Sequence, residues 1–177
     1  MAKEIKPEDI LQTAQSFMEC KILHSAAELN LFTVLSQRPM SAREVADIIS
    51  GDVRALSVLL DAIAAMGLLI KDVQTYECPP IFAQLLSDKS PQTLLPMVLH
   101  MASLWKRWSR LTDIVKGIDG ASGEFDLAHN PEEQRAFIGA MHSIGASLAE
   151  KIAAAAGPGS ARALLDVGGG SGTYTIA

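Results

Sequence analysis

Aromatic side chains and cysteines are scarce in this sequence. Phenylalanine, tryptophan and tyrosine make up 5% of its 177 residues, so aliphatic and methionine side chains must fill most of any core. The two cysteines, Cys20 and Cys78, lie too far apart in sequence to form a closely spaced metal motif. The histidines show no metal-binding motif either, and we expect no metal site and structural or surface roles for His24, His100, His129 and His142.

The sequence also lacks a membrane-spanning apolar run and a large basic cluster. Its longest apolar stretch, near 94–102, is interrupted by Pro96 and His100, and the first residues have no signal-peptide core. The formal net charge is −5, and the longest basic run is Lys106-Arg107. Because each phosphate contact requires a cation, this balance argues against nucleic-acid binding. We expect a cytoplasmic protein that binds no membrane and keeps its cysteines reduced.

Helical periodicity and capping residues predict four helices before Gly67. Two helices lie within 8–36, where apolar residues recur at three-to-four spacing. Ser41 and Glu44 fit a capping box that begins the third helix, which we expect to end at Gly51. Asp52 is suited to cap the fourth helix.

A short hairpin follows these helices in the order of a winged helix. The fourth helix covers 53–66, and apolar residues then predict strands over 68–72 and 75–78. Pro79-Pro80 ends the ladder because proline cannot donate a backbone hydrogen bond. We therefore predict a winged-helix-like domain over 1–90.

A winged helix leaves open a DNA-binding alternative, in which its second helix enters the major groove. In this sequence that helix would be the one predicted over 53–66, and Arg54 is its single cation among many apolar residues. That composition favours a buried dimer face over a DNA contact. A salt-dependent affinity for DNA would support the regulator, and its absence would exclude it.

Two longer helices are expected over 91–160. Apolar residues predict one helix over 92–116, followed by a loop at 117–123. Asn130-Pro131 marks the start of the other helix, which ends at Gly157-Pro158-Gly159. The apolar stripe of this helix is composed of Phe137, Met141, Ile144, Leu148 and Ile152.

The most specific motif joins a predicted buried strand, 162–167, to a predicted helix start at 173–177. Asp166 ends the strand, and glycines follow it two, four and six positions later. These three are Gly168, Gly170 and Gly172, and Gly169 lies between the first two. A dinucleotide fingerprint requires glycine or alanine where Thr173 stands. The spacing is instead that of the S-adenosylmethionine (SAM) loop of class I methyltransferases, with a flexible glycine-rich tail as the alternative.

Residues 164–173, LLDVGGGSGT, closely resemble the first SAM motif of an O-methyltransferase family. That family includes plant caffeate and isoflavone enzymes, acetylserotonin methyltransferase and bacterial antibiotic-pathway relatives. Segments 26–32 and 41–66 resemble its dimerisation domain, 104–108 the segment before its domain junction, and 137–141 the helix that leads into its catalytic domain. The resemblance covers nearly all 177 residues.

This resemblance implies a SAM-dependent O-methyltransferase that acts on a hydroxyl of a small aromatic or polyketide-like acceptor. Phe137 and Met141 would contact the acceptor or the methionine end of SAM, with core packing as the alternative role. The SAM site would comprise Asp166, Gly168, Gly169, Gly170 and Gly172. The family's general base is a histidine expected beyond residue 177, so no catalytic residue is assigned in this chain.

The expected fold class is mainly α, with three parts. A winged-helix-like dimerisation domain covers 1–90, a helical connector covers 91–160, and the incomplete start of a class I, Rossmann-like α/β methyltransferase domain covers 161–177. Exposed apolar surface on the helices of 8–36 and 92–116 predicts an intertwined homodimer through the N-terminal helices. Because a lone parallel strand has no ladder partner, we expect the last part to be poorly ordered or to lean on the dimer. The missing catalytic residues leave open a non-catalytic dimerisation or regulatory module.

Overall fold

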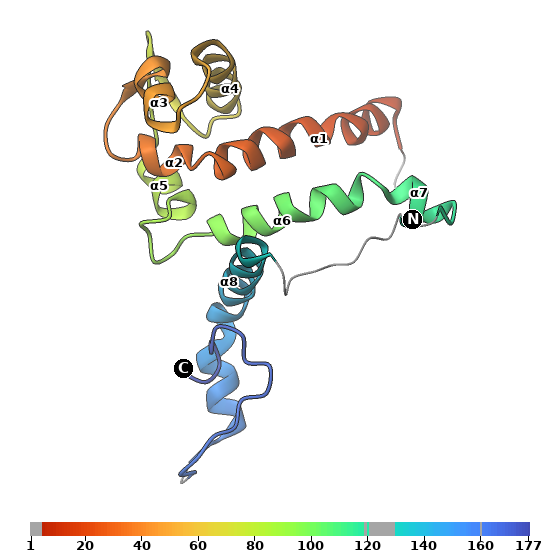
Figure 1. The fold of residues 1–177 in the computed structure, drawn as a ribbon. Coiled ribbons are helices and arrows are strands. Elements are labelled where there is room, and N and C mark those ends of the chain that lie inside the picture. The colour runs from red at the N-terminus through yellow and green to blue at the C-terminus, as the bar shows by residue number, and fades with distance from the viewer. Residues whose placement is uncertain (1–4, 119, 121–129, 160) are drawn as a thin grey trace. The chain divides into compact units, whose positions relative to one another are not determined.

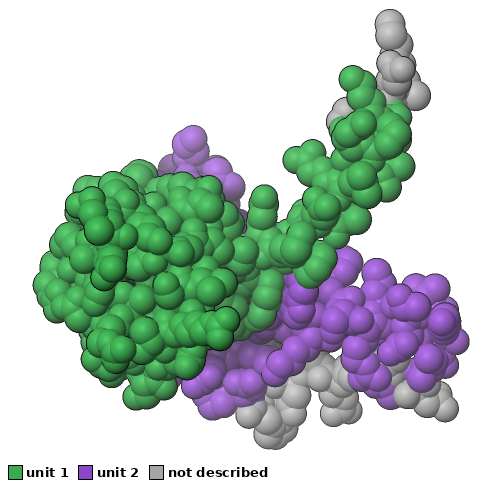
Figure 2. Space-filling model, turned by 90° about the horizontal axis from the view of Figure 1, so that it is seen from above, with its two compact units in different colours: residues 1–91 green, residues 92–177 purple. Residues whose placement is uncertain are grey.

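A computed structural model describes residues 5–118, 120, 130–159 and 161–177 of the chain (Figure 1). The chain divides into two compact units, residues 1–91 and 92–177, which are green and purple in Figure 2. Both units are mainly helical, as the sequence predicts. His129 and most of the predicted loop at 117–123 lie outside the described residues.

Unit 1 combines helices with a small antiparallel sheet. Its elements are α1 (Pro7–Glu28), α2 (Leu31–Leu35), β1 (Met40–Ser41), α3 (Ala42–Ile49), α4 (Val53–Ala65), β2 (Ile70–Asp72), β3 (Thr75–Glu77) and α5 (Pro80–Leu86). The sheet has the order β1-β3-β2, and Tyr76 of β3 pairs with Met40 on one side and with Lys71 on the other. The sequence did not predict β1 or α5. Pro80 occupies the first turn of α5, where its missing N–H costs nothing.

Side-chain caps begin α3 and α4 where the sequence places them. The Ser41 hydroxyl accepts from the Glu44 backbone N–H at 3.3 Å, and the Glu44 carboxylate accepts from the Ser41 N–H at 2.8 Å. The Asp52 carboxylate accepts from the Ala55 N–H at 2.7 Å. The capping predictions are therefore confirmed. The C-terminal cap of α3 differs, because Ser50 rather than Gly51 takes the left-handed conformation, with φ 55°.

The core of unit 1 lies where α2, α3 and α4 meet. Its largest fully buried side chains are Leu31, Phe32, Leu35, Val45, Leu60 and Ile63. Polar contacts fix the hairpin to α4: the Tyr76 hydroxyl donates to Asp61 at 2.5 Å, and the Lys71 ammonium does so at 2.6 Å. These bonds, led by that from Lys71, lower the pKa of the Asp61 carboxyl.

Most of α1 extends away from this core. Only His24, Ala26 and Ala27, near its C-terminal end, are buried. Figure 2 shows the helix leaving the body of unit 1 as a narrow arm. The exposed apolar side chains of α1 include Ile10, Leu11, Phe17 and Met18.

Unit 2 contains α6 (Leu95–Trp108), α7 (Leu111–Val115) and α8 (Pro131–Ala156). The prediction of one continuous helix over 92–116 is wrong. The helix begins at Leu95, whose N–H bonds to the Thr93 hydroxyl at 3.1 Å, and it breaks at Ser109-Arg110. The Ser109 hydroxyl donates to the Lys106 carbonyl at 2.8 Å, so this side chain competes for a helix carbonyl at the break.

Small residues pack α8 against the rest of unit 2. Asn130 caps the helix as predicted, because its side-chain oxygen accepts from the backbone N–H groups of Glu132 and Glu133, both at 3.2 Å. The buried row of α8 is Ala136, Ala140, Gly145 and Ala149. The apolar stripe noted in the sequence is not this buried row, since its members Met141, Ile144, Leu148 and Ile152 are exposed. Small side chains allow closer contact between helices than the larger stripe would.

The predicted buried strand at 162–167 is also wrong. These residues form no strand, Leu165 is 87% exposed, and turns rather than a helix follow Gly172. A strand forms only with a ladder partner, and every strand among the described residues lies in unit 1. No described helix is both long and apolar enough to cross a membrane.

Candidate functional site

The glycine loop predicted from the sequence adopts a conformation that glycine favours. Gly168, Gly170 and Gly172 have φ angles of 75°, 57° and 71°, in the left-handed region. Three backbone bonds close the loop. The Gly172 N–H donates to the Gly169 carbonyl at 2.8 Å, and the N–H groups of Thr175 and Ile176 donate to the Gly172 carbonyl at 3.0 and 3.1 Å. The alternation of left-handed glycines therefore shapes the turn locally.

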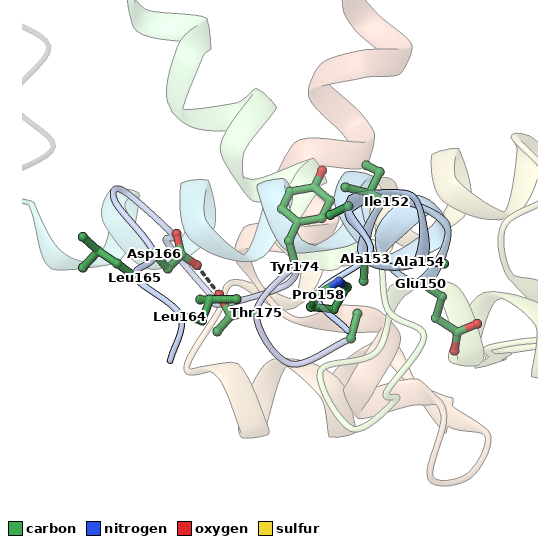
Figure 3. A pocket seen from close by; sticks show the side chains of 12 residues that line it. Glu150, Ile152, Ala153, Ala154, Pro158, Leu164, Leu165, Asp166, Tyr174 and Thr175 are labelled. Carbon is green, nitrogen blue, oxygen red and sulfur yellow. Dashed lines mark hydrogen bonds between the residues drawn. The ribbon is translucent and has the colours of Figure 1, made fainter. Parts of the chain in front are cut away.

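Asp166 and Gly169 lie in direct contact within this loop. A Cβ at Gly169 would displace the Asp166 carboxylate, which is the flexible end of an exposed side chain, and Gly169 has no positive φ. The Thr175 hydroxyl donates to the Asp166 carboxylate from the far side of the loop (Figure 3). The carboxylate is exposed and retains further lone pairs for a ligand.

The loop is attached to α8 through side-chain hydrogen bonds. His142 Nδ1 lies 2.8 Å from the Thr173 hydroxyl oxygen and 3.3 Å from the Ser171 hydroxyl oxygen. The two hydroxyl oxygens lie 2.5 Å apart. Gly145, one helical turn after His142, faces Thr173 and Tyr174, whose atoms lie 3.1–3.3 Å from where its Cβ would stand.

An open, largely apolar hollow of about 750 Å³ lies between the C-terminal half of α8 and the last residues of the chain. Figure 3 shows Ile152 from the helix and Asp166, Tyr174 and Thr175 from the C-terminal segment among its lining side chains. Asp166 is therefore placed at the edge between the glycine loop and this hollow. In the described parts of the chain, no three His, Cys, Asp or Glu side chains gather as a metal site would require.

Phe137 and Met141, the predicted acceptor contacts, lie on α8 shortly before His142, whose ring bonds to the glycine loop. The Phe137 ring packs edge-on against the buried His100 ring of α6, with 5.3 Å between centroids and an interplanar angle of 66°. Met141 is 40% exposed. The structure thus gives Phe137 a packing contact and leaves Met141 open, beside His142.

His142, Ser171, Thr173 and Thr175 were not among the site residues predicted from the sequence. We predicted a structural or surface role for His142, and the structure shows an exposed histidine whose ring bonds to the glycine loop. The only sequence signal for it is its position directly after Met141 in the 137–141 segment. Ser171 and Thr173 border the glycines, but their contact with α8 requires the fold.

Comparison with known proteins identifies the N-terminal part of the chain. The family model of the O-methyltransferase dimerisation domain matches residues 11–84. Residues 11–84 are an O-methyltransferase dimerisation domain. The resemblance predicted from the sequence is thereby confirmed for unit 1.

Relatives along the rest of the chain are methyltransferases. The chain is 30% identical over 172 residues to the tetracenomycin polyketide synthesis 8-O-methyl transferase TcmO of Streptomyces glaucescens, covering 94% of this chain and 51% of TcmO. It is 31% identical over 133 residues to the N,N-dimethyltransferase OxyT of Streptomyces rimosus, covering 75% of this chain and 38% of OxyT. The chain therefore spans about half or less of the length of these curated relatives.

A solved methyltransferase structure is similar to this chain in fold as well. The structure of PigF with SAH (S-adenosylhomocysteine) superposes with a TM-score of 0.81 at 25% identity, covering 97% of this chain and 54% of that one. PigF of Serratia sp. (strain ATCC 39006) is an S-adenosyl-L-methionine-dependent methyl transferase. The chain thus shares its fold with about half of that structure.

Proposed function

We propose that this chain corresponds to the N-terminal half of a SAM-dependent O-methyltransferase. The observation that carries the proposal is the acid–glycine loop at Asp166–Gly172, in a chain whose residues 11–84 are an O-methyltransferase dimerisation domain. We assign a winged-helix-like dimerisation domain to 1–90, a helical connector to 91–160, and the start of the class I methyltransferase domain to 161–177. The order α3, α4 and a hairpin paired to β1 supports the winged-helix assignment.

The glycine loop has the chemistry to hold SAM, which supplies a sulfonium-bound methyl group when bound. Space around Gly168 and Gly170 is open where their side chains would stand, so a ligand can approach the backbone closely. The Asp166 carboxylate suits the ammonium or hydroxyl groups of SAM. We assign SAM binding to Asp166, Gly168, Gly169, Gly170 and Gly172.

We propose a small aromatic or polyketide-like acceptor whose hydroxyl group receives the methyl group. The name of TcmO, a polyketide 8-O-methyl transferase, supports this class, whereas OxyT is an N,N-dimethyltransferase and points to an amine as the alternative acceptor. Met141 is exposed and is assigned an acceptor contact, together with Phe137. Both cysteines are free thiols, which supports a cytoplasmic location.

We further propose a homodimer in which α1 packs on a second copy. The exposed apolar side chains of α1 lie among acidic residues, including Glu8, Asp9 and Glu19. The segment 106–116 combines exposed Trp108, Leu111 and Val115 with four cations and one acid. Apolar faces of opposite charge suit each other at an interface.

The dimer is tested by mass measurement of Phe17→Glu with light scattering after size exclusion. A charge at the apolar α1 face should convert a dimer of the unmodified chain into a monomer, because an unpaired charge would be buried. Gln12→Glu adds the same charge at an exposed polar position of α1 and should remain dimeric. A monomeric unmodified chain, or a dimeric Phe17→Glu variant, would overturn this proposal.

SAM binding is tested by thermal unfolding of the chain during titration with SAM and SAH. A ligand bound only to the folded state adds about 2.7 kcal/mol at 100 times its Kd, which raises the melting temperature measurably. Asp166→Asn should reduce the shift, whereas Asp47→Asn, an exposed control on α3, should leave it unchanged. A cooperative melt without any shift would reject SAM binding by this chain and favour a non-catalytic dimerisation module. Salt-dependent DNA binding would instead favour the winged-helix regulator.

A further inference from the structure

We propose that His142 is a positioning residue that holds the glycine loop against α8 and thereby raises the affinity of the loop for SAM. The inference rests on the proposed function, and it assigns a role that neither the glycine motif nor the family match gives to this histidine. It starts from the cluster of His142, Ser171 and Thr173, which joins two segments about 30 residues apart.

Burial explains why the contact between His142 and Thr173 matters. Thr173 is 7% exposed, so its hydroxyl has lost most of its access to water and needs a partner within the protein. His142 Nδ1 at 2.8 Å and the Ser171 hydroxyl at 2.5 Å provide two. Both hydroxyls can reverse their donor direction, so the chain of bonds persists with a neutral or a protonated imidazole.

The backbone bonds of the loop do not attach it to the helix. The bonds from Gly172 to Gly169 and from Thr175 to Gly172 close the turn on itself. Attachment to α8 comes from His142, and from Gly145, whose missing side chain lets Thr173 and Tyr174 lie close to the helix. A turn shaped only by its own bonds is free to move as a body, and fixing it reduces the ordering cost of ligand binding.

Two glycines of the same loop have open space beside them. Apart from the glycine itself and its two neighbours in the chain, no heavy atom lies within 4 Å of the position that a Cβ would take at Gly168 or Gly170. The loop is therefore anchored through Thr173 while the backbone that would meet SAM stays accessible. His142 acts on the ligand through Thr173 and Ser171 rather than by contact with it.

Binding of SAH by calorimetry to the unmodified chain and three variants tests the proposal. His142→Ala and Thr173→Val should each raise the Kd about fivefold, or about 1 kcal/mol, because each removes the same hydrogen bond. The double variant should bind no more weakly than either single variant, since the two residues act as one unit. His142→Asn should restore affinity to within about twofold, because the asparagine amide can occupy the position of Nδ1. Gln134→Ala, an exposed position on the same helix, serves as the control.

Two measurements separate failure of this inference from failure of the proposed function. If the unmodified chain does not bind SAH, the proposed function is rejected. Binding by His142→Ala equal to that by Gln134→Ala, or additive effects in the double variant, would reject the role of His142 while leaving the function intact. Amide hydrogen exchange over 166–176 without ligand tests the attachment itself: it should accelerate in His142→Ala and recover in His142→Asn, and unchanged exchange would overturn the inference.

Discussion

Two glycines of α8 are expected to respond in opposite ways to replacement by alanine. Either substitution removes a helix-interior glycine and should gain about 1 kcal/mol of helix propensity. At Gly139 the new Cβ would stand 2.6 Å from Pro96 Cβ and 3.1 Å from Pro96 Cγ, which belong to a ring fixed in the first turn of α6. Overpacking of this kind costs about 1–3 kcal/mol, so Gly139→Ala should be destabilising by about 1 kcal/mol.

At Gly145 the side chains that a new Cβ would meet are able to move. The nearest atoms are the Tyr174 hydroxyl at 3.1 Å and Thr173 Cγ2 at 3.3 Å, and the half-exposed Tyr174 side chain can rotate away. Gly145→Ala should therefore retain part of the propensity gain and be neutral or stabilising by up to about 1 kcal/mol. The two variants should differ by about 1–2 kcal/mol in the free energy of unfolding, although they make the same chemical change in one helix.

Urea unfolding followed by tryptophan fluorescence measures this difference. Both tryptophans of the chain, Trp105 and Trp108, lie in α6, so their signal reports on unit 2. The midpoint should fall for Gly139→Ala without a change in the slope of the transition. Equal midpoints for the two variants, or a higher midpoint for Gly139→Ala, would refute the argument that the α6–α8 contact has no room for a methyl group.

Two further predictions concern unit 1. Val73 is a β-branched residue with φ 52° and is 86% exposed, so Val73→Asn should raise the free energy of unfolding by about 1 kcal/mol, measured by circular dichroism. The Ser41 backbone N–H, the Ser41 hydroxyl and the Arg38 guanidinium donate to the Glu44 carboxylate and lower its pKa from 4.5 to about 2. A depressed pKa stabilises the fold above pH 4.5, and this stabilisation is lost as the pH falls through about 2. Glu44→Gln should flatten the pH dependence of the melting temperature between pH 2 and 4.5. The same pH dependence in the variant and the unmodified chain would contradict a stabilising role for the Glu44 carboxylate.

Local signals predicted those parts of the fold that depend on neighbouring residues. Ser41, Asp52 and Asn130 each bond to a backbone N–H two or three positions later, so sequence spacing alone specifies the cap. The left-handed glycines of the loop belong to the same class, because a turn closed by its own backbone bonds needs no distant partner. These features would form in the same way in many tertiary contexts.

Elements that depend on distant partners were predicted less well. The apolar run at 162–167 has the composition of a buried strand, yet composition cannot supply the ladder that a strand requires. On α8 the large apolar residues gave the strongest periodic signal, whereas the buried row consists of alanines and a glycine. Close packing of two helices favours small side chains, and a pattern based on hydrophobicity alone gives them little weight.

The candidate site combines both cases. Sequence spacing identified Asp166 and the glycines because their chemistry toward a ligand is local to one loop. It did not identify His142, because the bond to Thr173 spans 31 residues and depends on how α8 lies beside the loop. One side of α8 is fixed to α6 where Gly139 meets Pro96, and the helix also carries Gly145 and His142 to the loop. A change that displaces α8 from α6 should therefore weaken ligand binding as well as stability, whereas His142→Ala should weaken binding without disturbing the contact with α6. Measuring both ligand affinity and stability in Gly139→Ala and His142→Ala therefore separates the effect of the α6–α8 contact from the effect of the bond between His142 and the loop.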